Sequence, residues 1–351
     1  MDKYLHQQGF SKGSVDSNLY IKIENDKLLI LVVYVDDIIF GSNEEAMSQS
    51  FALVMQEEFE MSLLGELTYF LGLQIQQNEG GIFLSQTKYL KQILKKYGME
   101  DAKPVCTAMV TGCSLSENDE SVAVHQPIYR SMVGSLLYLK GTRPDIMHAM
   151  GIVGRFQANP KETHLQAVKI IFKYLQGTQS YGLWYLRDTD LTLHAYTDAD
   201  WAGSMDDRKN TSGGAFFMGS RIVSWFSKKQ SSIALSTAEV EYVAAASCYT
   251  QRLWMMQTLQ DFQITCTPPI SSLSDNTSAI SISKNPVMHS KTKHISIKYH
   301  FLREQVLEQK VKLEYVSSKE QVADILTKPL PKDTFEYLRQ KLGVVDASSC
   351  C

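Results

Sequence analysis

Hydrophobic and polar positions in the first half of the chain predict strands first and helices afterwards. Residues 20–40 hold β-branched apolar runs interrupted by Asn-Asp and Asp-Asp pairs, a pattern typical of strands joined by tight turns. Apolar side chains recur at helical spacing in residues 44–60, and residues 127–177 are mostly helical in pattern. The stretch 100–125 is rich in Ser, Thr, Asp and Glu, so we expect an exposed loop there.

The second half alternates between strand and helix patterns. Three strand-like segments, LTLHAYTD, AFFMG and RIVSWFS, precede a long helix predicted from about residue 236 to residue 259. A strand in PPISSLSDN, a short helix, a helix over 296–309, the strand VKLEYV and a helix beginning near Gln321 follow. This order predicts an α/β fold, and we place the main domain boundary near residues 180–190.

Composition and charge are those of an ordinary globular protein. The 351 residues are 44% apolar and 21% charged, and the net charge of −3 gives no overall basic surface for nucleic acid. Six cysteines form no C-x-x-C pair, which favours a reduced protein. The N-terminus lacks the apolar core of a signal peptide, and the longest apolar run, residues 28–35, is too short to span a membrane. We expect an intracellular protein without a signal peptide or transmembrane segment.

Carboxylates stand at the ends or first turns of predicted elements in the second half, where residues from distant sequence can converge. They are Asp198, Glu241, Asp275 and Asp324. Hard Mg²⁺ ions prefer oxygen ligands, and two ions about 3.5–4 Å apart activate water and stabilise the leaving oxygen in phosphodiester cleavage. Close carboxylates without a metal would repel one another. Position alone singles these four out weakly, because the chain has 38 acidic residues.

The motifs around these carboxylates resemble a known family. The stretch from YTDADWAGS to STAEVEYVAAA, with SDNTSAISISKNPVMHS and QVADILTKPL after it, resembles the ribonuclease H domain of copia-type LTR-retrotransposon Pol polyproteins. The resemblance covers the whole second half, with the motifs in the family's order. It implies a ribonuclease H-like mixed sheet with flanking helices. It also implies an endonuclease that uses two Mg²⁺ ions, or Mn²⁺, to cut the RNA strand of RNA/DNA hybrids.

The resemblance also assigns the catalytic, metal-binding residues: Asp198, Glu241, Asp275 and Asp324. Two neighbours compete with them. Asp200 shares the strand parity of Asp198, so both could face the site. Glu239 lies about 200° around the helix from Glu241, so only one of the two can point inward. We favour Glu241, because the family pattern puts the acid directly before an aromatic residue and small residues.

Histidines depart from the usual pattern. Many ribonucleases H carry a histidine in the loop before the last aspartate, and the corresponding stretch here, VSSKEQVAD, has none. His289, His294 and His300 lie earlier in the sequence. We expect them to pack against helices and loops or to lie on the surface, and leave open a catalytic or RNA-contacting role for His294.

A second candidate site lies in the first half. The tetrapeptide YVDD, with Asp36 and Asp37, resembles the active-site hairpin of reverse transcriptases, where paired aspartates bind two Mg²⁺ ions. YFLGLQI, LSQTKYLKQIL, YRSMVGSLLYL and KYLQGT resemble the copia-type enzyme downstream of that hairpin. The resemblance implies a C-terminal fragment of a Pol polyprotein. It would comprise a truncated reverse transcriptase (palm, thumb and connection, α+β) over 1–185, a ribonuclease H-like domain over 190–331, and a C-terminal helix and tail over 332–351.

The polymerase site is expected to be incomplete. A polymerase needs a third aspartate from an upstream palm strand, and the available Asp2, Asp16 and Asp26 have no strand-to-helix context. We expect the fingers subdomain to be missing as well. We therefore expect no DNA synthesis by this chain alone, and interpret Asp36 and Asp37 as a polymerase remnant.

Basic residues are candidates for contact with nucleic acid. One predicted helix carries Lys88, Lys91, Lys95 and Lys96, as a duplex-binding face or as an ordinary solvated face. The candidate substrate contacts of the second half are Arg208, Lys209, Lys228, Lys229, Lys293 and His294. A hybrid would be distinguished through the 2′-hydroxyls of its RNA strand.

The leading hypothesis is a two-metal endonuclease within a truncated retrotransposon reverse transcriptase. Its partners would be an RNA/DNA hybrid or another duplex and other parts of the polyprotein, in a cytoplasmic particle or the nucleus. The alternative is a catalytically silent or domesticated fragment that only binds nucleic acid or a protein. Integrase or transposase chemistry on the same fold would need a late glutamate on a helix, whereas the late acid here is Asp324.

Overall fold

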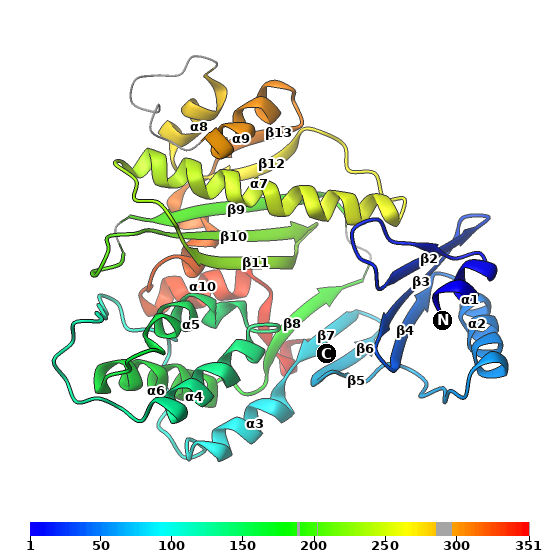
Figure 1. Ribbon diagram of the computed structural model, residues 1–351, viewed down its shortest axis with the longest axis horizontal. Coiled ribbons are helices and arrows are strands. Elements are labelled where there is room, and N and C mark those ends of the chain that lie inside the picture. The colour runs from blue at the N-terminus through cyan, green and yellow to red at the C-terminus, as the bar shows by residue number, and fades with distance from the viewer. Residues whose placement is uncertain (188–189, 202, 286–296, 351) are drawn as a thin grey trace. The chain divides into compact units, whose positions relative to one another are not determined.

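The chain divides into two compact units (Figure 1). The computed structural model describes residues 1–187, 190–201, 203–285 and 297–350. The smaller unit comprises Met1–Leu67 and Thr250–Thr267, and the larger unit comprises Thr68–Tyr249 and Pro268–Cys351. All four candidate carboxylates of the second half belong to the larger unit.

The smaller unit contains an antiparallel sheet with the strand order β1-β2-β3-β4. Its elements are α1 (Asp2–Gln7), β1 (Ser11–Lys12), β2 (Leu19–Glu24), β3 (Lys27–Tyr34), β4 (Asp37–Ser42) and α2 (Glu45–Glu58). Leu5, Leu31 and Phe51 join helices and sheet in one buried core. The strands predicted in residues 20–40 are confirmed. Asn25 and Asp26 between β2 and β3 both have positive φ, as a type I′ hairpin turn requires.

The larger unit contains an antiparallel sheet with the order β14-β8-β7-β6-β5. Its strands are β5 (Tyr69–Phe70), β6 (Leu73–Asn78), β7 (Gly81–Ser85), β8 (Tyr181–Leu186) and β14 (Val344–Asp346). Segments far apart in the sequence meet in this sheet, because Leu183 of β8 lies opposite Leu84 on one side and Val344 on the other.

Helices of the larger unit pack around a buried ion pair. They are α3 (Thr87–Lys96), α4 (Gln126–Leu139), η1 (Pro144–Ile146), α5 (Met147–Val153), η2 (Gly154–Phe156) and α6 (Glu162–Gln176). Arg143, 1% exposed, forms an ion pair of 2.7 Å with Asp145, and the hydroxyl of Tyr174 donates a hydrogen bond to the same carboxylate. This network joins the start of η1 to α6 inside the core.

A mixed sheet with the order β11-β10-β9-β12-β13 forms the rest of the larger unit. Its strands are β9 (Leu193–Asp200), β10 (Thr211–Met218), β11 (Arg221–Lys229), β12 (Ile270–Ser274) and β13 (Val311–Tyr315). β9, β10 and β11 are antiparallel neighbours, whereas β12 is parallel to both β9 and β13. Because β12 runs parallel to β9, the residue that directly follows β12 lies beside the end of β9.

Helices flank this mixed sheet. Figure 1 shows the long helix α7 (Thr237–Asp261), of which residues 237–249 belong to the larger unit and lie beside this sheet, and α8 (Thr277–Lys284) and α9 (Ile297–Leu307) contact β13. The remaining elements are η4 (Ser318–Glu320), η5 (Val322–Leu326), α10 (Lys332–Lys341) and η6 (Ala347–Cys350). The expected α/β class, with a mixed sheet and flanking helices, is confirmed. The helix predicted near Gln321 is a short 3-10 helix, η5, rather than an α-helix.

No helix in the described part of the chain is long and apolar enough to cross a membrane. The predicted domain ranges 1–185, 190–331 and 332–351 follow the family resemblance rather than compactness, and they stay predictions. The structure does show that β14, within the last of these ranges, pairs with β8 of the first.

Candidate metal centre

Strand β9 buries Asp198 near its end. The Asp198 side chain is 2% exposed, and its residue pairs in register with Gly213 of β10. The backbone of Gly213 lies so close to Thr327 that a Cβ at this position would be 2.6 Å from Cγ2 of Thr327. This approach lets the hydroxyl of Thr327 donate a hydrogen bond to Asp198.

Helix α7 separates the roles of Glu239 and Glu241. The Oγ of Ser236 accepts a hydrogen bond from the amide of Glu239 at 3.3 Å, and Oε2 of Glu239 accepts one from the amide of Leu235 at 2.7 Å. Glu239 therefore serves the start of the helix, in the manner of a capping box. Glu241 points toward β9, where its Oε1 accepts a hydrogen bond from the amide of Ala199 at 3.3 Å.

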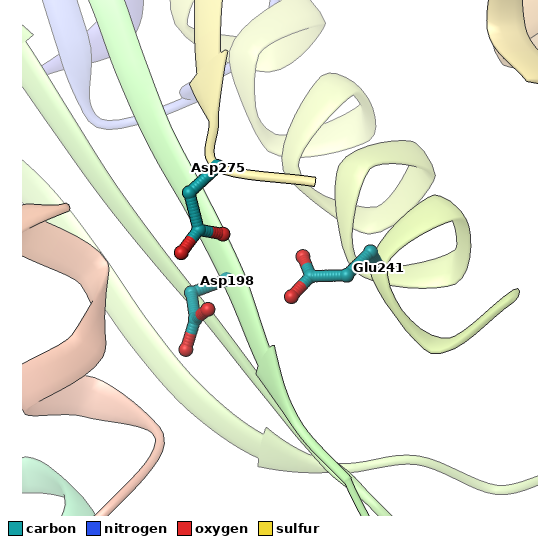
Figure 2. Close-up of side chains that lie close together, drawn as sticks. All are labelled: Asp198, Glu241 and Asp275. Carbon is teal, nitrogen blue, oxygen red and sulfur yellow. The ribbon is translucent and has the colours of Figure 1, made fainter. Parts of the chain in front are cut away.

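Asp275 follows β12 directly and completes a group of three carboxylates. One oxygen each of Asp198, Glu241 and Asp275 lies within 4.8 Å of the others. Figure 2 shows the three side chains pointing toward one another from a strand, a helix and the end of a second strand. Ser318 of η4 donates a hydrogen bond of 2.7 Å to Asp275. Within the residues that the structure describes, this is the one such group of three potential metal ligands.

Asp324 lies beside this group, and its carboxylate forms an ion pair with a lysine. Its Oδ1 forms an ion pair of 3.0 Å with Nζ of Lys328, which also lies 3.7 Å from Oδ2 of Asp198. Asp324 is 7% exposed. The structure thus brings three of the four predicted acids into one group and connects the fourth through a lysine.

Burial and mutual repulsion disfavour negative charge at this site. Burial, followed by the charges of Asp198 and Asp275, raises the pKa of Glu241 to about 9. Burial, followed by the charge of Asp198, raises the pKa of Asp324 to about 7. Burial raises the pKa of the neighbouring Asp200 to about 6. These shifts mean that the positive charge around the carboxylates is too small to keep all of them ionised at neutral pH.

A divalent cation fits this donor set. Oxygens that bind one Mg²⁺ at about 2.1 Å lie at most about 4.2 Å apart, so small side-chain rotations would bring the three acids into range. The second carboxylate oxygen of Glu241 is buried and has no hydrogen-bond partner among the described residues. A buried, unpaired carboxylate oxygen is costly, and a hard cation would satisfy it.

The other predicted site residues lie apart from this group. Asp36 and Asp37 are exposed at the turn between β3 and β4, where Val35 has a φ of 53°. They stay predicted polymerase ligands, and the described residues place no third acid with them. Lys88, Lys91, Lys95 and Lys96 are all exposed on α3.

The predicted substrate contacts of the second half differ in their surroundings. Lys229 and Lys209 lie 2.9 Å and 3.5 Å from carboxylate oxygens of Asp207. Arg208 and Lys228 are exposed. Lys293, His289 and His294 lie outside the described residues, as does the side chain of His300.

Ser318, Thr327 and Lys328 contact the carboxylates and were not predicted from the sequence. Ser318 and Thr327 are hydroxyl donors of a kind that the sequence contains in large number. The contact of Lys328 with Asp324 could have been predicted from their spacing. Lys328 follows Asp324 by four residues, and side chains at this spacing meet on one face of a helix.

Comparison with known proteins places the chain in a family. The family model described as Reverse transcriptase (RNA-dependent DNA polymerase) matches residues 1–111. The Retrovirus-related Pol polyprotein from transposon RE1 of Arabidopsis thaliana is 37% identical over 97% of this chain and 23% of that polyprotein. The one from transposon TNT 1-94 of Nicotiana tabacum is 35% identical over 98% of this chain and 26% of that polyprotein. The chain therefore spans about a quarter of the length of these relatives.

A solved structure is also similar. It is the N-terminal RNase H domain of Rv2228c from Mycobacterium tuberculosis, fused to maltose binding protein, which matches 43% of this chain and 98% of that chain at 13% identity and a TM-score of 0.28. The sequence identity to the transposon proteins extends over nearly the whole chain. The chain belongs to the family of retrovirus-related Pol polyproteins of copia-type transposons, and its first 111 residues match their reverse transcriptase.

Proposed function

We propose that the larger unit is a metal-dependent endonuclease that cuts the RNA strand of RNA/DNA hybrids. The observation that carries the proposal is the convergence of Asp198, Glu241 and Asp275, where one buried oxygen of Glu241 has no hydrogen-bond partner within the part of the chain that the structure describes. Family membership supports the substrate class. An RNA-dependent DNA polymerase makes DNA on an RNA template, so a hybrid is the product that a nuclease on the same chain would meet.

The chain's own residues would hold and orient the metal. Asp198, Glu241 and Asp275 would be ligands, with Asp324 at the edge of the site. Hydrogen bonds from Thr327 to Asp198 and from Ser318 to Asp275 fix the orientation of these two carboxylates, as outer partners of metal ligands generally do. Bound Mg²⁺ or Mn²⁺ would supply an activated water and stabilise the leaving oxygen of the phosphodiester.

Exposed basic residues near the mixed sheet would contact the phosphates of the hybrid. Arg208 and Lys228 are exposed, and we propose them as phosphate contacts. Lys209 and Lys229 lie against Asp207, so they would first have to leave an ion pair. Loss of a phosphate contact should weaken binding uniformly across sequences and reduce its salt dependence.

A cleavage assay tests the proposal. The purified chain is incubated with an end-labelled RNA/DNA hybrid in Mg²⁺ or in EDTA, with single-stranded RNA and duplex DNA as comparison substrates. We expect metal-dependent cutting of the hybrid's RNA strand, and a loss of at least about 100-fold in Asp198→Asn, because an amide binds a hard cation poorly. Asp333→Asn, at an exposed position in the first turn of α10, is the matched control and should retain activity.

Two results would contradict the enzyme. One is cleavage that persists in EDTA, and the other is cleavage that survives Asp198→Asn at full rate. A wild-type chain that binds the hybrid without cutting it would instead favour the catalytically silent fragment.

A further inference from the structure

Lys328 is a positive charge among the buried carboxylates of the proposed centre. Its Nζ lies 3.0 Å from Oδ1 of Asp324 and 3.7 Å from Oδ2 of Asp198. Asp198 and Asp324 are both buried, whereas the Lys328 side chain is 36% exposed. The ammonium group therefore reaches inward from a position that is open to solvent.

The position of the ammonium group is one that a divalent cation could take. The ammonium group bridges one oxygen of Asp198 and one oxygen of Asp324. Asp198 is a member of the group of three acids, whereas Asp324 lies outside that group. Nζ–O distances of 3.0 and 3.7 Å leave room for an ion whose oxygen ligands lie about 2.1 Å away. An ammonium and a divalent ion cannot both occupy this space, because like charges would lie within a few ångströms of each other.

We propose that Lys328 is a resident counter-ion of the carboxylates, which bridges Asp198 and Asp324 in the metal-free protein and is displaced when a divalent ion binds between them. The proposal rests on the proposed function, since it assumes that the carboxylates bind metal. It adds a positioning residue, held by the same carboxylates that receive the metal.

The chemistry of lysine suits this role. A lysine carries a compact charge on a flexible four-carbon stem, so it can swing outward without any change in the backbone. Its partly exposed side chain provides a path to water.

Chemical labelling tests the displacement directly in the wild-type chain. The protein is treated briefly with an amine-acylating reagent, with and without saturating Mg²⁺, and acylation at each lysine is measured by mass spectrometry. We expect acylation of Lys328 to increase at least about threefold with Mg²⁺, since release from two carboxylates exposes the amine. Exposed Lys103 should not change. Unchanged or reduced acylation of Lys328 in the metal-bound protein would overturn the displacement.

Thermal melting tests the counter-ion role without metal. Lys328→Met keeps the length of the side chain and removes its charge, and Lys103→Met makes the same change at an exposed loop position. In EDTA we expect Lys328→Met to lower Tm by about 3 °C or more relative to Lys103→Met, and saturating Mg²⁺ to remove most of this difference. Equal Tm values of the two variants in EDTA would exclude the counter-ion role.

Calorimetric titration with Mn²⁺ separates this proposal from the proposed function. We expect Lys328→Met to bind the ion about tenfold more tightly than wild type, because no cation has to leave first. If neither protein binds metal, the metal centre itself is wrong, and the displacement is wrong with it. If both bind metal with the same affinity, the metal centre stands and the displacement by Lys328 is wrong.

Discussion

The repulsion among the carboxylates should make the stability of the metal-free protein depend on pH, with Glu241 as the main source. Burial and the charges of Asp198 and Asp275 raise its pKa from the ordinary 4.5 to about 9. Between these two values the folded protein holds a proton that the unfolded chain releases. The free energy of unfolding therefore falls as pH rises, and the stabilisation is fully present only below pH 4.5.

The expected size follows from the shift. A group that is protonated only in the folded state changes the free energy of unfolding by about 1.4 kcal/mol per pH unit. From pH 6 to pH 8, Glu241 would account for up to about 3 kcal/mol. Asp324, whose pKa is raised to about 7, acts in the same direction over the lower part of this range. In a unit of this size, such a change lowers Tm by roughly 6 °C.

Urea unfolding at a series of pH values in EDTA measures this dependence. Glu241→Gln cannot ionise, so its curve should be nearly flat between pH 6 and pH 8 apart from the contribution of Asp324. Glu239→Gln, two residues away and bonded at the helix start, should keep the wild-type slope. Saturating Mg²⁺ should remove the slope in wild type. A wild-type slope that persists in Glu241→Gln would refute the assignment of the shift to this carboxylate.

Two further predictions concern stability in other parts of the chain. Arg143→Leu should cost about 3–5 kcal/mol in urea unfolding, because Asp145, which is 2% exposed, would lose the charge that compensates it. The double variant Arg143→Leu/Asp145→Leu should recover part of this loss, and a cost below about 1 kcal/mol for the single change would show that the ion pair matters little. Val35→Gly should raise stability by about 1 kcal/mol, since Val35 is a β-branched residue with a φ of 53° at a two-residue turn. Val35→Ala retains a Cβ and should bring less benefit, so an equal gain from both would contradict strain relief.

Sequence patterns predicted the individual strands and helices better than they predicted which strands pair with each other. Runs of β-branched and other apolar residues between turn residues located β2, β3, β9 and β10, because the signal for a strand is local. The pattern could not show that β14 pairs with β8, since such pairing depends on chain segments distant in sequence. It also could not distinguish the 3-10 helix η5 from an α-helix over five residues.

Family motifs predicted the acids of the candidate site, and local physical chemistry explains the rest of its arrangement. The choice between Glu239 and Glu241 follows from capping, because Ser236 and Leu235 engage Glu239 at the start of the helix. Thr327 was beyond prediction, since its hydrogen bond to Asp198 depends on a close approach at Gly213 of another strand. Hydroxyls carry no pattern that marks such a contact in advance.

The pairing of β14 with β8 has a consequence for how the protein is made. About 160 residues separate the two strands, and a ribosome adding 5–20 residues per second needs roughly 8–30 s to synthesise them. During that interval the edge of β8 at Tyr181–Leu183 has no partner strand, and an open edge can pair with another chain. Nascent chains crowded on one messenger RNA would meet in this state. Until β14 is made, this edge is therefore open to pairing between chains.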